Sequence, residues 1–211
     1  MTKQECQDIF DGVMLSDGSI GFTHGSRIPY FMIGLSGTDH LDWITSIRSA
    51  LTTLGIPVTE NYPKVYHKTS KGRPYEQLTL CSRVSSLLPY SRWYKYWRKV
   101  VPVDIVLSNR LLANWMMGDG SSTYCGGSVY VKFSTCSYTT DEVMMLIGKF
   151  VQIGIYHPYL IRNQGLPEIR IGRSDDVKHL MDMVEPYIHE SYMYKVKRPV
   201  LKGPKSMSIT V

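Results

Sequence analysis

The sequence predicts an α+β protein made of two pseudo-symmetric αββαββα repeats. One short segment occurs twice, at residues 9–19 and at residues 111–121. Both copies read as an apolar helix that ends in Asp-Gly-Ser, with Asp17 in the first copy and Asp119 in the second. Each copy is followed by the same order of predicted strands and helices. We therefore expect a saddle of antiparallel strands with helices behind it, joined at the two motif helices.

The motif helices carry small or polar residues where two helix backbones would meet. Gly12 and Ser16 lie one turn apart in the first helix, as do Asn114 and Gly118 in the second. Each motif ends in an Asp-Gly pair, which is also common at ordinary helix ends and turns. The occurrence of two such copies favours a joint site at which the two aspartates meet.

In the first repeat, the motif helix is followed by a predicted hairpin at residues 19–23 and 29–35. A helix at residues 39–54 and a second hairpin at residues 57–68 and 73–82 come next. A further helix is predicted at residues 84–96, interrupted near Pro89. Its aromatic residues, Trp93, Tyr94, Tyr96 and Trp97, are expected to pack in the core and at interfaces rather than stack on bases.

In the second repeat, Ser108 is predicted to cap the motif helix. A strand at 128–135, a helix at 141–153 capped by Thr140, a hairpin at 156–162 and 167–173, and a helix at 175–188 follow. We assign residues 1–100 to the first repeat, 101–107 to a linker, 108–197 to the second repeat and 198–211 to a C-terminal tail.

The chain is basic, with a net charge of +6, a pI near 9.1 and fifteen tyrosines among 211 residues. This balance suits a polyanionic partner such as nucleic acid. The four cysteines form no Cys-x-x-Cys pair, which argues against a zinc site or a disulfide framework. With no predicted signal or membrane span, we expect a soluble protein in a reducing compartment: a mitochondrion or chloroplast if organelle-encoded, otherwise the cytoplasm.

Alternation along the predicted strands places polar, cationic and aromatic side chains on one outward face, suited to phosphates and base edges in a major groove. In the first repeat the candidate DNA-binding residues are Tyr30, Met32, Lys64, Tyr66, Lys68, Arg73, Tyr75, Gln77 and Thr79. In the second repeat they are Tyr130, Lys132, Ser134, Tyr159, Arg162, Glu168 and Arg170.

Residues 10–18 and 112–120 resemble the two motifs of a single-chain LAGLIDADG homing endonuclease. The Trp-Met-Met-Gly-Asp-Gly sequence at 115–120 is especially typical of the second motif. The resemblance covers nearly the whole chain. Two positions depart from it, because Asp11 and Asn114 replace small residues of the helix interface, but both acidic positions are intact.

The resemblance implies hydrolysis of one phosphodiester in each strand of a long, asymmetric double-stranded DNA target, leaving short 3′ overhangs. It implies that Asp17 and Asp119 bind Mg²⁺, for which Mn²⁺ can substitute, with the backbone carbonyls of Ser16 and Gly118 as further ligands. Lys99 and Lys195 match the basic positions near the metal site of such enzymes. The duplicated motif favours a monomer.

Two other functions stay open at this point. A protein of the same fold could be a maturase that binds its own intron RNA, or a DNA-binding protein that does not cut. A hydrolase of small acidic or sugar substrates could use the aspartates as general acid and base. The intact aspartates favour cleavage over binding alone, and the basic strand faces favour a nucleic acid over a small substrate.

Overall fold

The computed structural model describes residues 1–22, 28–58, 61–83 and 91–199. The first half comprises α1 (Lys3–Leu15), β1 (Ser19–Phe22), β2 (Pro29–Ser36), α2 (Leu41–Thr53), β3 (Lys64–Ser70) and β4 (Arg73–Arg83). A short hairpin of β5 (Tyr94–Lys95) and β6 (Arg98–Lys99) follows. The second half comprises α3 (Asn109–Gly118), β7 (Gly120–Cys125), β8 (Ser128–Ser134), α4 (Thr140–Gln152), β9 (Pro158–Asn163), β10 (Leu166–Ile171), α5 (Ser174–Val184), η2 (Glu185–Tyr187) and η3 (Glu190–Lys195).

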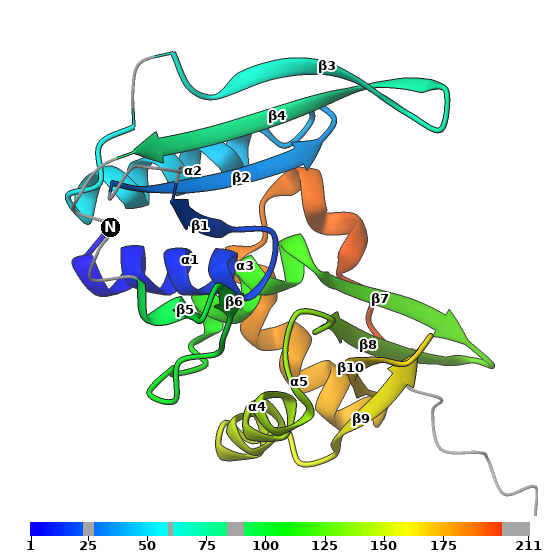
Figure 1. Ribbon diagram of the computed structural model, residues 1–211. Coiled ribbons are helices and arrows are strands. Elements are labelled where there is room, and N and C mark those ends of the chain that lie inside the picture. Colours follow the sequence, from blue (N-terminus) through cyan, green and yellow to red (C-terminus); the bar gives the residue numbers. More distant parts are fainter. Residues whose placement is uncertain (23–27, 59–60, 84–90, 200–211) are drawn as a thin grey trace, which may run out of the picture.

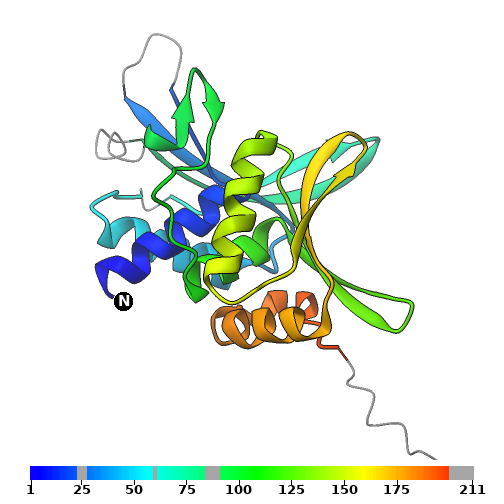
Figure 2. The same ribbon diagram turned by 90° about the horizontal axis from the view of Figure 1, so that it is seen from below.

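Each half forms its own four-stranded sheet, and the two sheets have the same strand order. The first has strand order β1-β2-β4-β3 and the second β7-β8-β10-β9, and neighbouring strands in both are antiparallel. Figure 1 shows one sheet above and one below the central pair α1 and α3, and Figure 2 shows the same arrangement from below. The predicted fold class, two related repeats joined at their motif helices, is confirmed.

One face of each sheet packs against helices. In the first sheet Phe31, Ile33 and Leu80 are fully buried, and in the second Val131 and Phe133 are fully buried. Removing a side chain of this size from water contributes about 1.5–3 kcal/mol. Every second residue along these strands is therefore apolar and packs in the core. The side chains between them face away from the helices.

The motif helices pack closely at the small residues that the sequence singled out. A Cβ atom on Gly12 would lie 2.4 Å from the carbonyl oxygen of Leu111, and one on Gly118 would lie 2.4 Å from the Cβ of Ser16. Ser108 caps α3 as predicted, since its side chain accepts a hydrogen bond from the backbone N–H of Leu111. The cap of α4 is Thr139 rather than the predicted Thr140.

Residues 91–93 form a 3₁₀ turn, but the helix predicted at residues 84–96 is wrong from Tyr94 onwards. Residues 84–90 lie outside the described residues, and Tyr94–Lys95 forms a strand paired with Arg98–Lys99. Trp93 is fully buried, as predicted, but Tyr96 and Trp97 are 87% and 84% exposed at the hairpin tip. The aromatic residues suggested a helix, yet two of them occupy a turn.

Two further findings bear on the expectations from composition. All four cysteines are free. Among the described residues, no helix has the length and apolar character needed to cross a membrane.

Candidate active site

The candidate active site lies where α1 and α3 end side by side. Asp17 follows the C-terminal cap of α1, and Asp119 is itself the C-terminal cap of α3. The helices approach so closely that a Cβ on Gly118 would lie 3.0 Å from Oδ2 of Asp17. Two carboxylates from different repeats therefore converge at one place.

A lysine caps each of these helix ends. Nζ of Lys99 donates to the carbonyl oxygens of Ser16 and Gly18, each at 2.8 Å. Nζ of Lys195 donates to the carbonyl oxygens of Met117 at 2.6 Å and Gly118 at 2.7 Å. Carbonyl oxygens at a helix C-terminus carry partial negative charge, which an ammonium group stabilises. The structure thus brings together all four residues predicted to be catalytic.

The four charged groups perturb one another. Burial raises the pKa of Asp119 to about 6, with a further contribution from the nearby charge of Asp17. Burial also raises the pKa of Asp17, against the attraction of Lys195 and Lys99. The pKa values of Lys99 and Lys195 fall to about 8, again because burial disfavours their charge. Clustered groups with displaced pKa values are common at functional sites.

The site is open on one side. Asp17 reaches solvent, and a hollow of about 320 Å³ beside it is lined by side chains that include Ser36, His40, Tyr194 and Lys195. The sequence did not single out Ser36, His40 or Tyr194, which come from β2, its following loop and η3. A substrate can therefore reach Asp17 from the side on which Lys195 lies.

A family model described as the LAGLIDADG DNA endonuclease family matches residues 7–175. This range contains α1 from Gln7 onwards, all of α3, both aspartates and every strand of the two four-stranded sheets. The chain belongs to the LAGLIDADG DNA endonuclease family.

Three relatives illustrate the similarity. An uncharacterized protein of Methanocaldococcus jannaschii is 25% identical over 196 residues, which cover 92% of this chain and 74% of that protein. The intron-encoded endonuclease ai4 of Dictyostelium discoideum is 30% identical over 129 residues, covering 58% of this chain and 76% of that protein. The homing endonuclease I-WcaI, solved bound to its DNA recognition sequence, shares the fold, with a TM-score of 0.79 over 94% of this chain and 88% of that one at 19% identity.

In this LAGLIDADG chain, the donor atoms at the helix ends suit a hard divalent cation. Asp17 and Asp119 supply carboxylate oxygens, and Ser16 and Gly118 supply carbonyl oxygens that already attract the ammonium groups of Lys99 and Lys195. Mg²⁺ prefers oxygen ligands of this kind and usually keeps several waters. The described residues hold no cluster of three or more His, Cys, Asp or Glu side chains for a metal. A metal here would therefore depend on the two aspartates.

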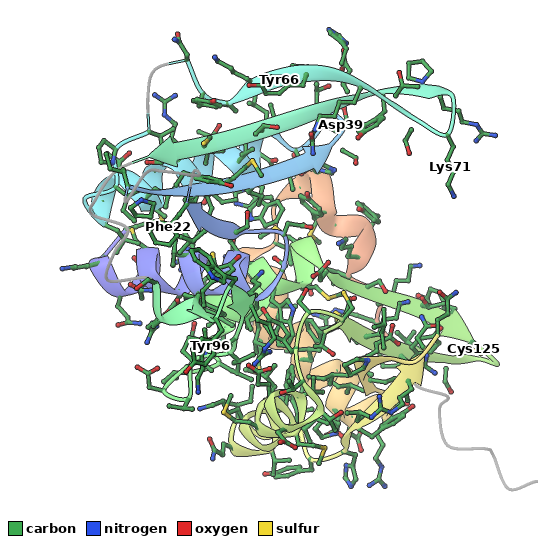
Figure 3. All side chains as sticks on the ribbon, viewed as in Figure 1. Phe22, Asp39, Tyr66, Lys71, Tyr96 and Cys125 are labelled. Carbon is green, nitrogen blue, oxygen red and sulfur yellow. The ribbon has the colours of Figure 1, made fainter. Side chains whose placement is uncertain are left out.

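The first sheet places its candidate DNA-binding residues on one face. Lys64 lies opposite Thr79, Tyr66 opposite Gln77 and Lys68 opposite Tyr75 across the β3–β4 pair. Residues at alternate positions share a face, so these six stand together with Arg73, Met32 and Tyr30. Every β3 side chain is exposed, and Figure 3 shows Tyr66 on this strand and Lys71 at the β3–β4 turn.

The second sheet differs from the prediction at two positions. Arg162 lies three residues after Tyr159 in the same strand, so the two side chains point to opposite faces. Nη2 of Arg162 donates to Oγ1 of Thr140, at the start of α4 on the helical side. Its predicted place on the same outward face as Tyr159 is therefore wrong.

Glu168 is the second correction. It is 5% exposed, and its carboxylate oxygens lie 3.4 Å from Nζ of Lys132 and 3.5 Å from Nη2 of Arg170. Arg170 also stacks over the ring of Tyr130 at 4.5 Å. Glu168 is therefore a counter-ion that holds two cations of the face, rather than an exposed contact. Ser134 lies opposite Glu168 on the same face, and Tyr159 lies opposite Arg170.

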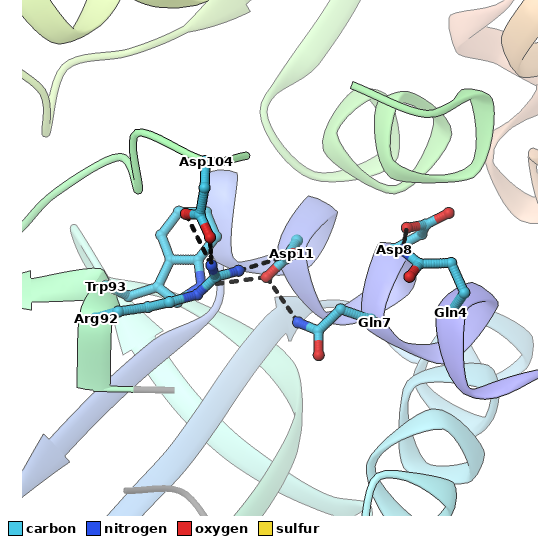
Figure 4. A network of polar contacts seen from close by, with 7 residues as sticks. All are labelled: Gln4, Gln7, Asp8, Asp11, Arg92, Trp93 and Asp104. Atoms are coloured by element: carbon cyan, nitrogen blue, oxygen red, sulfur yellow. Dashed lines mark hydrogen bonds and ion pairs between the residues drawn. The ribbon is translucent and has the colours of Figure 1, made fainter. Parts of the chain in front are cut away.

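The two departures from the family motif have structural partners. Asp11 accepts hydrogen bonds from the indole of Trp93 at 3.2 Å and from Arg92 at 3.3 Å, while Arg92 also binds Asp104 (Figure 4). Asn114 accepts a hydrogen bond from the indole of Trp43 at 2.8 Å. Each polar side chain thus accepts the hydrogen bond that the indole N–H of a buried tryptophan donates. The Asp11 network also ties α1 to the segment that leads into the Lys99 hairpin.

Tyr138 is a site residue that the sequence did not reveal. Its hydroxyl contacts the carbonyl oxygens of Met14 and Leu15 at 3.2 Å each, at the end of α1. Tyr138 comes from the second half, so this contact joins the repeats behind Asp17. Burial raises its pKa, which keeps the phenol protonated as a donor.

The ionised form of Asp119 should lower the free energy of unfolding. Its folded-state pKa of about 6 exceeds the ordinary 3.8, so the folded chain binds this proton more tightly than the unfolded chain does. The free energy of unfolding therefore falls as pH rises from about 4 to about 6 and stays lower above that. We expect Asp119→Asn to raise the free energy of unfolding in EDTA by about 1–3 kcal/mol near pH 7.5.

Urea denaturation with and without this substitution checks the expectation. The gain should shrink as the pH falls below about 6 and disappear below about pH 3, where Asp119 is protonated in both states. Asp141→Asn, at an exposed carboxylate in the first turn of α4, is the matched control and should change little. A variant no more stable than the wild type near pH 7.5 would contradict the burial cost assigned to Asp119.

Proposed function

We propose that this protein is a site-specific endonuclease that hydrolyses one phosphodiester in each strand of a long, asymmetric double-stranded DNA target. The observation that carries the proposal is the meeting of Asp17 and Asp119, one from each repeat, beside Lys99 and Lys195. Membership of the LAGLIDADG DNA endonuclease family supports it. The likeness to I-WcaI, a homing endonuclease solved with its recognition sequence, supplies a consistent fold.

In this proposal Asp17 and Asp119, with the carbonyls of Ser16 and Gly118, hold Mg²⁺, and Mn²⁺ can substitute. The bound ion supplies an activated water and neutralises charge on the phosphate. Lys99 and Lys195 stand beside the carboxylates and stabilise the negative charge that develops on the phosphate oxygens. Because Lys99 belongs to the first repeat and Lys195 to the second, each strand of the duplex has its own lysine.

The sheet faces bind the target on either side of this centre. The halves are chemically unequal, since the first carries Lys64 and Lys68 on an open strand, whereas Glu168 offsets Lys132 and Arg170 in the second. An unequal pair of faces fits an asymmetric target. Since one chain supplies both halves of the centre, we propose that a monomer acts.

The protein would act where its gene is expressed. The Dictyostelium relative is an intron-encoded endonuclease, and by analogy we propose an intron-encoded origin for this chain. We retain its own intron RNA as a further partner within this proposal. Proposed locations are a mitochondrion or chloroplast for an organellar gene, and otherwise the cytoplasm.

Selection from randomised duplex DNA tests the proposed function. The protein would first select DNA in Ca²⁺, and Mg²⁺ would then be added, with EDTA in parallel, before all new ends are sequenced. We expect breaks at one long sequence with Mg²⁺ only. Selection without breaks would instead support a maturase or a DNA-binding protein. If the protein neither selected nor cut DNA, the proposed DNA target would be refuted.

Salt dependence gives a prediction about the first sheet. If Lys64 and Lys68 contact phosphates, each substitution by Ala should weaken binding at all sequences and reduce the log–log salt slope by about 1. Lys132→Ala should have a smaller effect, because Glu168 already offsets its charge. Fluorescence anisotropy at several salt concentrations measures the slopes. Lys178→Ala, in α5 and paired with Asp182, is the control, and equal slopes for all variants would contradict the assignment.

A further inference from the structure

The turn of the β5–β6 hairpin has an unusual sequence for its conformation. Lys95 pairs with Arg98, which leaves Tyr96 and Trp97 as a two-residue turn. Their φ angles are +49° and +66°, the pattern of a type I′ turn, in which Asn-Gly is strongly preferred. Positive φ is a marked outlier for bulky residues. The aromatic pair is therefore present in spite of local backbone preference.

Burial does not explain the pair either. Tyr96 is 87% exposed and Trp97 is 84% exposed. Trp97 makes an edge contact with Phe22 at 6.2 Å between ring centroids, and Nζ of Lys95 lies 5.8 Å from the centroid of Tyr96. Backbone strain at exposed residues is typical of functional positions. Two large aromatic rings are thus presented to the exterior at an energetic cost to the fold.

The base of the hairpin is firmly held. Arg98 donates to Glu142 of α4 at 2.6 Å, and the hydroxyl of Tyr94 accepts a hydrogen bond from the backbone N–H of Ile20 at 3.3 Å. Lys99 follows directly and reaches the carbonyls of Ser16 and Gly18. Figure 2 shows the hairpin standing out beside β1 and β2, and Figure 3 labels Tyr96 at its tip. The hairpin is therefore a fixed arm.

The tip is close to the candidate active site. Trp97 precedes Lys99 by two residues, a span of about 7 Å along a strand. Lys95 adds a positive charge beside the Tyr96 ring, whereas Arg98 is paired with Glu142. An exposed aromatic pair with a cation beside it matches nucleic acid, whose bases offer stacking surfaces and whose backbone is anionic.

We propose that Tyr96 and Trp97 form an aromatic wedge that enters the minor groove of double-stranded DNA. The wedge contacts a base step beside the phosphodiester whose charge Lys99 stabilises. Apolar side chains inserted between base steps from the minor groove unstack and kink the duplex. This inference rests on the proposed function, since it assigns a further residue pair to the same DNA. The wedge positions the scissile phosphate at Lys99.

Tryptophan fluorescence tests the contact directly. Of the four tryptophans, Trp43, Trp93 and Trp115 are fully buried, so emission that acrylamide quenches comes from Trp97. Adding the duplex selected by the wild-type protein, in Ca²⁺, should lower the quenching constant towards that of Trp97→Phe. An unchanged quenching constant at saturating DNA would refute the wedge.

Substitution of the turn separates a DNA role from a structural one. The double variant Tyr96→Asn/Trp97→Gly gives the turn its preferred residues, so its melting temperature should equal or exceed that of the wild type. Its affinity for the selected duplex and its cleavage rate should fall about tenfold. Tyr156→Asn, at an exposed tyrosine whose backbone binds Asp176 on the helical side, is the control and should leave DNA binding unchanged.

The outcomes distinguish this inference from the proposed function. If the wild type binds and cuts DNA while the double variant matches it, the wedge is refuted and the function stands. If the double variant melts lower and binds DNA normally, the pair serves packing against Phe22, which also refutes the wedge. If the wild type does not bind duplex DNA at all, the proposed function and the wedge fail together.

Discussion

Asp17→Asn and Asp119→Asn should each reduce cleavage of the selected duplex by at least about a thousandfold, because each removes a negative charge from the proposed metal site. Asparagine has nearly the same shape, so the packing of α1 against α3 should survive. Binding to the duplex should stay within about threefold of the wild type, since the sheet faces are untouched. Single-turnover cleavage in Mg²⁺ and anisotropy in Ca²⁺ measure the two quantities.

Asp141→Asn is the matched control. It removes an exposed carboxylate from α4 and does not change the C-terminal ends of α1 and α3. Its cleavage rate should equal that of the wild type. If either active-site variant cut at the wild-type rate, its aspartate would not belong to the centre. Loss of binding and folding together would instead assign the aspartates a structural role.

The second large effect concerns the helix interface. Gly12→Ala would place a Cβ atom 2.4 Å from the carbonyl oxygen of Leu111 and 2.7 Å from the Cβ of Asn114. Backbone atoms cannot yield without moving α3, so the free energy of unfolding should fall by about 2–3 kcal/mol. Urea denaturation provides the measurement.

Gly148→Ala is the control for this prediction. Gly148 lies exposed within α4, and a Cβ added there meets no atom within 4 Å. Alanine favours the helix, so this variant should be more stable by about 0.5–1 kcal/mol. If both variants changed stability equally, close approach at Gly12 would not explain the packing of the motif helices.

The sequence predicted the centre of the fold because the relevant signals are local and doubled. Gly12 and Gly118 lie on helical faces that periodicity identifies, and Asp17 and Asp119 end those helices. Pseudo-symmetry then indicates that the two ends meet. Lys99 and Lys195 were placed by family resemblance rather than by any local pattern, and the structure shows the carbonyl oxygens that hold them.

Most of the wrong predictions concern residues whose conformation or partner is set by contacts that are distant in the sequence. Tyr96 and Trp97 carry no turn signal, so the helix predicted at residues 84–96 extended into their hairpin. Glu168 alternates correctly within β10, but its pairing with Lys132 depends on which strand lies beside it. Arg162 was a simpler error, because strand alternation from Tyr159 already excluded it from the same face. Tyr138 reaches α1 across the repeat interface, which no single-sequence pattern encodes.

The most direct measurement of the central claim is strand-resolved mapping of the ends that the wild-type protein produces on its selected duplex. A composite centre with one lysine for each strand predicts one break per strand, offset to leave short 3′ overhangs, with Mg²⁺ and not with EDTA. Breaks confined to one strand, or breaks that persist in EDTA, would contradict a centre shared by Asp17 and Asp119.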